Sequence, residues 1–481
     1  MGRTLTKLYN GILGVRFIIQ KHRRSMNLSI TRRGLFAIPI PAALIAGTRR
    51  SLPYDFHHDN LMGTSLDLTV FADSESQARR AEVAALHEIE RLDSILSTYK
   101  AATEISRLNA STLATACSPD LFALLELYHQ WSNATGGALS ATPNHPEGIV
   151  LDRVAQTVTR AANATINLDA LGKAYVLDRA AAAALAQSGV SHLMLNIGGD
   201  IVFTQGPNEW IAGIANPARP HDNAEPLTRL ALKRGAVAAS GSYARGAHII
   251  DARSGTPALT GKCATAIAPN AVTANALATA LCILAPKDGI ALVDATPAAE
   301  ALITSPGAQF RSAHFAAFER PLFKAVQAAS KWTAGYELSI NVTLKSPDGG
   351  RGFRRPYVAI WAENANGHTV KTIALWVSKP RWIRDLDHWY HSNQDTNWNA
   401  VARATRAPGK YRVVWDGLDD NGKAVPIGTY KIFVESNREH GNYALENATI
   451  ECGSKKSSVT TRDNSEFEAV SIEFGPHVDQ A

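Results

Sequence analysis

The composition of the chain changes sharply near Trp332, and this change limits what the chain can fold into. Seven of the nine tryptophans lie at or after Trp332, whereas the alanine-rich runs lie before it. A chain of 481 residues has room for two or three domains. We therefore predict a first domain over 51–304, a second domain over 331–481, and a linker or edge of the first domain at 305–330.

The first domain mixes two hydrophobic periods, which predicts the α+β class. One helix is indicated by apolar residues four and three positions apart, namely Ala85, Ile89, Leu92, Leu96 and Tyr99. Ser118 and Pro119 are typical of a helix start and Gly136 of its end, and a third helix is predicted over 172–189. Short β-rich runs are broken by Gly, Asn and Pro: 192–197, 201–204, 209–214, 235–239, 247–251 and 264–268.

The second domain alternates apolar and polar residues along short runs, beginning with YELSINVTL at Tyr336. Four more such runs follow, RPYVAIWAE, VKTIALWV, YRVVWDG and TYKIFVES. This pattern is typical of an all-β, Ig-like sandwich of antiparallel strands. The DDNG sequence at Asp419 lacks the spaced ligands of an EF-hand and is interpreted as a hairpin turn.

The basic character of the chain is confined to its start. Residues 1–50 hold ten Lys and Arg and no acidic residue, so the net charge of +6 becomes −4 over 51–481. No basic and aromatic residues interleave as in a nucleic-acid groove. A nucleic-acid partner is therefore not expected.

Residues 1–50 are predicted to be a twin-arginine export leader. Arg32 and Arg33 precede an apolar stretch of roughly a dozen residues, which is too short to span a bilayer as a helix. Met26 is an alternative start, and a buried basic-apolar segment is an alternative interpretation. The predicted location is the periplasm or the outer face of the inner membrane, with the leader either cleaved or retained as a membrane anchor.

The four cysteines, Cys117, Cys263, Cys282 and Cys452, have no metal-binding or redox spacing. They are predicted to be buried small hydrophobic residues. A disulfide stays open as an alternative, since the sequence does not pair them.

Six segments in order carry a family resemblance: MGT at 62, STYK at 97, LGKAYVLDRA at 171, LNIGGDI at 195, SGSYARGAHIIDARSG at 240 and TANALATALCILAP at 273. Together they resemble the FAD:protein FMN transferase (ApbE-type) family over about 59–304. The region after Trp332 resembles an uncharacterised β-domain appended to flavin transferases, and its WDGLDDNG segment is similar to an Ig-like repeat of flagellar-hook capping proteins.

The resemblance implies a transfer of FMN from FAD to a Ser or Thr hydroxyl of an acceptor protein, with Mg²⁺ and release of AMP. It places cofactor contacts on Met62, Tyr99, Ala138, Leu139, Ser140, Asn167, Lys173 and Ile250. Most have a plain structural alternative, because Met62, Leu139 and Ile250 would suit a core and Tyr99 continues the helix stripe. Lys173 beside Gly172 at a helix start favours contact with a phosphate, and a solvated surface lysine is the alternative.

His248 is the candidate catalytic or phosphate-contacting residue of the HIIDARSG segment, with a structural histidine as the alternative. A histidine there can accept a proton from a hydroxyl near neutral pH, and the family motif has a histidine at this position. Asp251 and Arg253 are interpreted as a pair that fixes the turn. Gly198, Gly199 and Asp200 are predicted to form a tight turn that lets the backbone approach a ligand.

The predicted metal site is poor in acidic residues. The family resemblance places Mg²⁺ on an acid and a threonine four residues apart, with main-chain oxygens near Ala170 and Val272. In this chain Asn275 replaces the acid and Thr279 is kept, on the same helix face. Further neutral residues stand where the family often has Asp, namely Ser140, Ser242 and Asn167.

Three functions therefore remain open at this level. The first is a flavin transferase whose acceptor is a membrane redox protein. The second is an FAD pyrophosphatase that uses water in place of the protein hydroxyl. The third is a non-catalytic FAD-binding scaffold for a periplasmic or membrane redox system.

Overall fold

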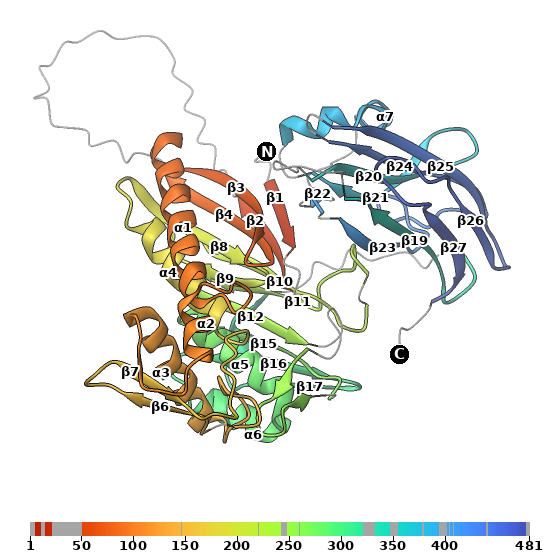
Figure 1. Ribbon diagram of the computed structural model, residues 1–481. Coiled ribbons are helices and arrows are strands. Elements are labelled where there is room, and N and C mark those ends of the chain that lie inside the picture. The colour runs from red at the N-terminus through yellow and green to blue at the C-terminus, as the bar shows by residue number, and fades with distance from the viewer. Residues whose placement is uncertain are drawn as a thin grey trace, which may run out of the picture.

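The computed structural model describes strand backbones near the start of the chain and most of the chain after Ser51 (Figure 1). The description leaves out the following residues: 1–4, 11–14, 22–50, 146, 220, 242–247, 259, 321–331, 347–354, 378–379, 394–401, 404, 407, 439–440 and 478–481.

An eight-stranded antiparallel sheet forms the centre of the first domain, in the order β17-β16-β15-β12-β9-β8-β4-β3. Its strands are β3 (Leu52–Leu61), β4 (Thr64–Ala72), β8 (Val190–Ile197), β9 (Asp200–Phe203), β12 (Gly235–Gly241), β15 (Cys263–Ala268), β16 (Glu300–Ser305) and β17 (Ala308–Arg311). Residues 305–311, expected in a linker or edge, thus continue this sheet.

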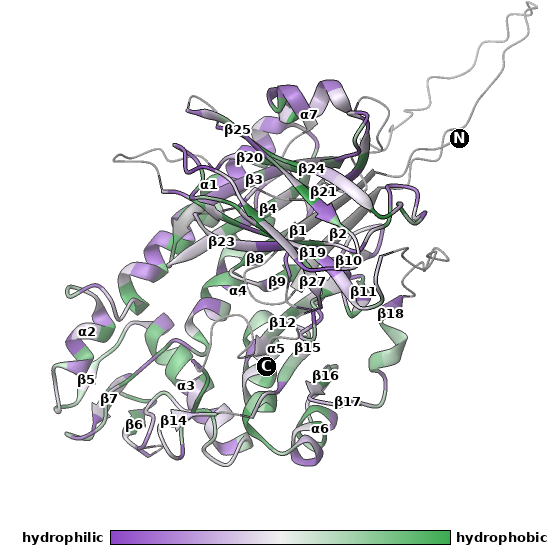
Figure 2. Cartoon of the chain, turned by 90° about the vertical axis from the view of Figure 1, so that its right-hand side faces the viewer, coloured by the Kyte–Doolittle hydropathy of each residue, from purple (hydrophilic) through white to green (hydrophobic). Residues whose placement is uncertain are grey.

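Helices cover one face of this sheet. Alternate residues of each strand point to opposite sides, so one strand contributes to two separate cores. Ala264 and Ala266 of β15 pack in the core with the helices, whereas Ile267 packs in a separate core on the other face. Figure 2 shows that α5 and the strands that it covers consist largely of hydrophobic residues. The helices are α1 (Glu75–Leu96), α2 (Glu104–Asn109), α3 (Pro119–Ala134), α4 (Gly172–Leu185), α5 (Ala271–Ile283) and α6 (Pro286–Asp294).

The predicted helices are present, but the first ends before Tyr99 and the third, predicted to reach residue 189, ends at Leu185. Ser118 accepts a hydrogen bond from the Leu121 N–H at 3.4 Å and Pro119 is the first residue of α3, as the capping pattern predicts. Helix α1 ends at Leu96, so Tyr99 does not continue its buried stripe. Tyr99 is 87% exposed, which excludes the core alternative for this residue.

Two small sheets lie beside the helices. One joins β5 (Thr115–Ala116), β6 (Ile149–Asp152) and β7 (Thr157–Arg160), and the other pairs β13 (Ile250–Asp251) with β14 (Thr256–Pro257). The strand predicted over 247–251 is therefore only two residues long.

A ten-stranded sheet runs from the first domain into the second, in the order β18-β11-β10-β2-β1-β22-β21-β20-β24-β25. Its first-domain strands are β10 (Trp210–Ile214), β11 (Thr228–Leu232) and β18 (Glu319–Arg320), and the hairpin of β1 (Leu5–Asn10) and β2 (Val15–Lys21) lies between the domains. Arg32 and Arg33 lie outside the described residues, so the export leader stays a prediction.

The second domain is an all-β sandwich, as predicted. One sheet contains β20 (Tyr357–Glu363), β21 (Thr369–Trp376), β22 (Ala402–Arg403), β24 (Gly428–Asn437) and β25 (Tyr443–Cys452). The other contains β19 (Tyr336–Leu344), β23 (Gly409–Trp415), β26 (Ser457–Thr460) and β27 (Ser471–Pro476). Short helical segments also occur here and in the first domain, namely η1 (Phe315–Ala317), η2 (Pro380–Asp385) and α7 (Asp387–Ser392).

The hydrophobic core of the sandwich lies between its two sheets and includes Trp332, Trp376 and Trp415. The DDNG segment forms a turn, since the Asp419 carboxylate accepts hydrogen bonds from the N–H groups of Asn421 and Lys423, both at 2.8 Å. This geometry uses the carboxylate for the turn itself, in agreement with the hairpin interpretation.

A loop of the first domain is bonded directly to the sandwich. Asn223 accepts from the Val414 N–H at 2.9 Å and donates to the Val414 carbonyl at 2.7 Å and to the Ile373 carbonyl at 3.3 Å. The Asp222 carboxylate pairs with the buried Arg406 guanidinium at 2.7 Å. Arg406 in turn lies over the Trp376 ring, 5.3 Å from its centroid. We call this set of contacts the junction.

All four cysteines are free thiols, and three of them are buried. Burial raises the pKa of Cys117 to about 11 and that of Cys452 to about 12. The prediction of small buried hydrophobic residues is therefore confirmed for Cys117, Cys282 and Cys452. Among the described residues, no helix has the length and hydrophobicity required to cross a membrane.

Candidate functional site

Two tight turns lie next to each other at one end of the eight-stranded sheet. Met62 and Gly63 connect β3 to β4 with positive φ angles of 49° and 72°. Gly198 and Gly199 connect β8 to β9 with φ angles of 63° and 109°. Since β4 pairs with β8, the two turns are neighbours, and the Gly198 N–H donates to the Ser65 carbonyl at 3.3 Å.

The turn at Gly198 and Gly199 is held by a hydrogen bond to Asn196 and is packed against Thr64. The Asn196 side chain accepts from the Gly199 N–H at 3.0 Å and donates to the buried Asp67 carboxylate at 3.2 Å. A Cβ atom on Gly198 would lie 3.0 Å from the Thr64 hydroxyl oxygen, so a larger residue would crowd Thr64. The tight turn predicted at Gly198 and Gly199 is confirmed.

Helix α5 brings Asn275 and Thr279 to the same sheet end. The Asn275 amide donates to the Asp200 carboxylate, with 2.8 Å between Nδ2 and Oδ2. One turn further along the helix, the Thr279 hydroxyl lies 3.4 Å from the Ser240 hydroxyl at the end of β12. Sequence reasoning predicted Asp200 only as part of the turn and did not predict its contact with Asn275.

The start of α5 is fixed by a half-buried acid on α4. The Asp178 carboxylate accepts from the Ala271 N–H at 2.8 Å and from the Val272 N–H at 3.1 Å. Burial raises the pKa of Asp178 to about 6. Val272, a predicted main-chain metal ligand, lies in the first turn of α5, where carbonyl groups point along the helix axis.

A second group of predicted residues gathers where three loops meet. The Ala252 N–H donates to the Ala138 carbonyl at 3.0 Å, and the Asn167 N–H donates to the Ala141 carbonyl at 2.7 Å. These bonds bring the 138–140 segment, Asn167 and Ile250 together. The side chains of Ala138, Leu139 and Ser140 are buried, so this segment offers its backbone more than its side chains.

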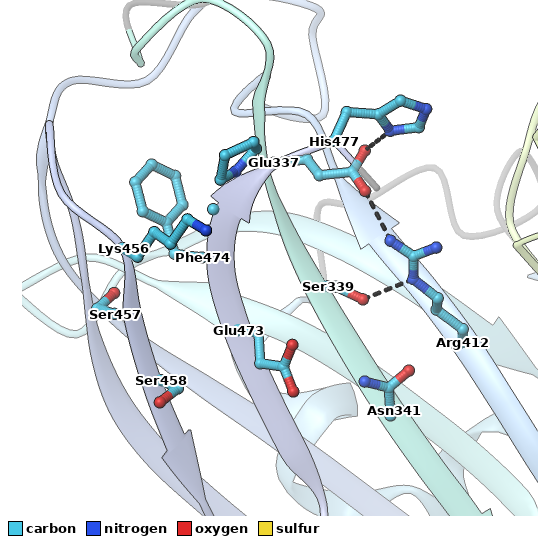
Figure 3. A pocket seen from close by; sticks show the side chains of 12 residues that line it. Glu337, Ser339, Asn341, Arg412, Lys456, Ser457, Ser458, Glu473, Phe474 and His477 are labelled. Atoms are coloured by element: carbon cyan, nitrogen blue, oxygen red, sulfur yellow. Dashed lines mark hydrogen bonds and ion pairs between the residues drawn. The ribbon is translucent and has the colours of Figure 1, made fainter. Parts of the chain in front are cut away.

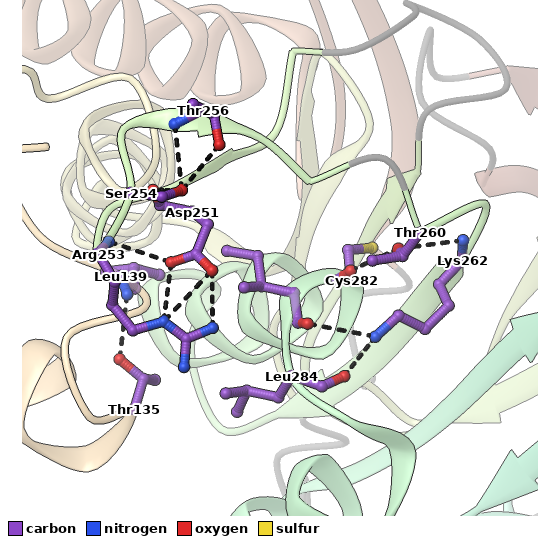
Figure 4. A network of polar contacts seen from close by, with 11 residues as sticks. Thr135, Leu139, Asp251, Arg253, Ser254, Thr256, Thr260, Lys262, Cys282 and Leu284 are labelled. Carbon is purple, nitrogen blue, oxygen red and sulfur yellow. Dashed lines mark hydrogen bonds and ion pairs between the residues drawn. The ribbon is translucent and has the colours of Figure 1, made fainter. Parts of the chain in front are cut away.

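Figure 4 shows the polar contacts around this loop group. The Leu139 N–H donates to the Thr135 hydroxyl at 3.1 Å, and Arg253 pairs with Asp251 at 2.7 Å. Hydrogen bonding to Arg253 lowers the pKa of Asp251. The predicted pairing of Asp251 with Arg253 is confirmed, while Ile250 is 37% exposed and thus not a core residue.

The segment before α4 leads into a helix start that no side chain caps. Asn167 accepts from the Asp169 N–H at 2.7 Å and donates to the Asp169 carboxylate at 3.2 Å, which turns the chain toward Ala170. Helix α4 begins at Gly172 with neither a side-chain cap nor an acidic residue in its first turn. Its N–H groups and positive dipole end therefore favour an anion near Lys173.

The structure describes His248 but not Ser242. His248 is exposed and precedes β13, whereas Ser242 lies in the segment 242–247 outside the described residues. The proton-accepting role of His248 stays a prediction.

A polar depression of about 930 Å³ lies on the second domain, over the sheet of β19, β23, β26 and β27 (Figure 3). Arg412 pairs with Glu337 at 2.8 Å and donates to the Ser339 hydroxyl at 2.7 Å, while His477 contacts the other Glu337 oxygen at 2.8 Å. Its lining contains none of the predicted flavin residues, and several of its charges pair with one another. We therefore place the candidate site at the sheet end of the first domain.

The fold and these segments define an ApbE-type domain. The model of the ApbE family matches residues 62–145 and 141–303, about half of the chain, and the chain belongs to this family. A second family, described as "Predicted periplasmic protein (DUF2271)", matches 337–469. No functionally curated protein gives a significant match.

Solved structures of ApbE proteins share the fold of the first domain. The ApbE protein of Thermotoga maritima is 25% identical with a TM-score of 0.50, and the match covers 56% of the present chain and 100% of that protein. The flavin transferase ApbE of Vibrio cholerae is 18% identical with a TM-score of 0.49, covering 56% and 99%. The flavinyl transferase ApbE of Pseudomonas stutzeri, in its apo form, is 18% identical with a TM-score of 0.48. The match covers 56% of the present chain and 99% of that protein.

Proposed function

We propose that the protein is an FAD:protein FMN transferase that acts in the periplasm. The observation that carries the proposal is the convergence of Met62, Asn275 and Thr279 at one sheet end of an ApbE-family domain. The start of α4, which has no side-chain cap, supplies a positive dipole end and the charge of Lys173, both suited to phosphates.

In the proposed reaction, the oxygen of a Ser or Thr hydroxyl on the acceptor attacks the phosphorus on the FMN side of the pyrophosphate. The bond from that phosphorus to the bridging oxygen breaks, and AMP leaves with the bridging oxygen. His248 accepts the hydroxyl proton, since an imidazole nitrogen can act as a general base. The exposed positions of His248 and Tyr99 leave both side chains accessible to a ligand or an acceptor.

Mg²⁺ would supply positive charge opposite the phosphates when bound. The residues fit a weakly charged magnesium site, because the Asn275 Oδ1 atom is buried and accepts no hydrogen bond from any described residue. Within the described part of the chain, no three His, Cys, Asp or Glu side chains gather into a metal site. Mg²⁺ commonly keeps waters and substrate phosphates as ligands, so few protein oxygens are sufficient.

The acceptor is proposed to be a membrane redox protein that carries a Ser or Thr target motif. The family match of the second domain, described as periplasmic, supports the periplasmic location. Export through the twin-arginine pair Arg32 and Arg33 is part of the same proposal. Changing both arginines to lysine should leave the protein in the cytoplasm, as cell fractionation would show.

Product analysis tests the transferase against its two alternatives. The purified protein is incubated with FAD, Mg²⁺ and an acceptor peptide with the Ser/Thr motif, and the products are analysed by mass spectrometry. Peptide carrying FMN together with free AMP supports transfer. Free FMN with AMP and unmodified peptide would identify a pyrophosphatase, whereas unchanged FAD that stays bound would identify an FAD-binding scaffold.

A further inference from the structure

Asp200 is a buried acid at the candidate metal site that the family pattern of helix acid and threonine does not include. It is the first residue of β9, directly after the two glycines, and only 4% of its surface is exposed. The glycine turn fixes its backbone, and the Asn275 amide fixes its carboxylate at 2.8 Å. The carboxylate is therefore held in one orientation beside the face of α5 that carries Asn275 and Thr279.

The residue at position 275 and the acid at position 200 depend on each other. An acid at 275 would place two carboxylates within hydrogen-bond distance, and like charges that close cannot both ionise easily. An asparagine has nearly the same shape but donates an N–H, so it can hydrogen-bond the neighbouring carboxylate, as Asn275 does to Asp200 at 2.8 Å. Asp200 is thus the carboxylate that lies against the amide standing where the family resemblance places the helix acid.

Buried oxygen atoms around Asp200 point to a cation as the missing partner. The Asn275 Oδ1 atom and the Thr64 hydroxyl oxygen are both buried, and neither has a hydrogen-bond partner among the described residues. Thr64 is 6% exposed and lies against Gly198, on the turn that leads to Asp200. Carboxylate, amide and hydroxyl oxygens are the ligands that hard divalent cations prefer.

We propose that Asp200 supplies the carboxylate of the divalent-cation site in this chain, in place of the helix acid that Asn275 replaces. Asn275 both orients Asp200 through its amide nitrogen and contributes its own oxygen, and Thr279 lies one turn further along the same helix. This inference rests on the proposed flavin transferase and names the metal-binding acid of the same site.

The test exchanges the acid between the two positions. Mn²⁺ is used as the probe because its paramagnetism reports binding directly, and it is titrated into the full-length protein with and without FAD. Asp200→Asn should weaken Mn²⁺ binding at least tenfold. The double variant Asp200→Asn with Asn275→Asp returns the acid to the helix and should recover most of the affinity, which a merely structural role of Asp200 does not predict.

Asp152→Asn is the matched control, because Asp152 accepts two backbone hydrogen bonds in the exposed turn between β6 and β7. It should bind Mn²⁺ as the wild type does. A second readout is the single variant Asn275→Asp, which places two acids together. Its melting temperature without metal should fall below that of the wild type and should rise more steeply when Mn²⁺ is added.

The outcomes separate this inference from the proposed function. If Asp200→Asn binds Mn²⁺ as tightly as the wild type while FAD binding and transfer persist, the assignment of Asp200 is wrong and the transferase stands. If the wild type binds FAD but no Mn²⁺, the metal site itself is overturned. If it binds neither FAD nor Mn²⁺, both the inference and the proposed function fail.

Discussion

The junction and the sheet-end site both bury polar groups, but they treat them differently. At the junction, the buried Arg406 meets the Asp222 carboxylate, and Asn223 bonds to both backbone groups of Val414. At the sheet end, buried oxygens of Thr64 and Asn275 have no donor among the described residues. An unsatisfied buried polar atom costs free energy, so it persists where a ligand completes it.

This difference separates a structural role from a functional one. At the junction the Asp222 carboxylate, the Asn223 amide and the Arg406 guanidinium bond within the chain, although the Trp376 Nε1 atom has no partner among the described residues, and these bonds contribute to the stability of the two-domain arrangement. In the proposed site, these acceptor oxygens of the sheet end bind a cation from outside the chain. Changes at the junction should consequently alter unfolding, whereas changes at the sheet end should alter ligand binding.

The largest effect on stability is expected at the junction. Asp222→Ala removes the carboxylate that pairs with the buried Arg406 guanidinium, which should cost about 3 kcal/mol of unfolding free energy. Urea unfolding measures the loss. Asp387→Ala, which breaks an exposed pair with His391, is the control and should cost less than about 0.5 kcal/mol. Equal losses for the two variants would contradict the structural importance of the junction.

A smaller, pH-dependent effect is expected in the second domain at Glu435 of β24, whose carboxyl group contacts α7. Burial raises the pKa of this carboxyl, although it accepts hydrogen bonds from the N–H groups of His388 and Trp389 and from the Tyr443 hydroxyl. The folded state therefore holds the proton more tightly than the unfolded state. The stabilisation that this carboxyl contributes should be present at low pH. It should be lost as the pH rises from the ordinary pKa of 4.5 through the raised pKa of the folded state.

Thermal unfolding of the wild type and of Glu435→Gln across this pH range measures the effect. The variant should show a flatter dependence of stability on pH, because it has no proton to lose at this position. A steeper or unchanged dependence would show that other groups dominate the acid range.

The smallest effect is expected from the exposed pair beside the loop group. Arg253→Ala removes an ion pair with Asp251 that is partly open to solvent and should cost about 0.5 kcal/mol. FAD affinity, measured by calorimetry, should change less than twofold if the pair only fixes the turn. A large loss of affinity with unchanged stability would place Arg253 in the ligand site.

Local signals in the sequence were sufficient for many elements of the fold. Ser118 and Pro119 start α3 as predicted, because a cap and a preset φ act within one turn of the chain. The first strand of the sandwich runs from Tyr336 to Leu344 as predicted, since its alternating pattern is long and unbroken. Tyr99 was misassigned because its spacing fits the stripe of α1, whereas the helix ends three residues earlier.

The sequence by itself determined the two-domain composition, the main helices and the residue types of the candidate site, because these depend on neighbours along the chain. Only the tertiary structure decided that Asp200 meets Asn275 and that Asn223 meets Val414, pairs separated by 75 and 191 residues. Such contacts depend on how the sheets and helices pack. Periodicity and capping carry no information about that packing.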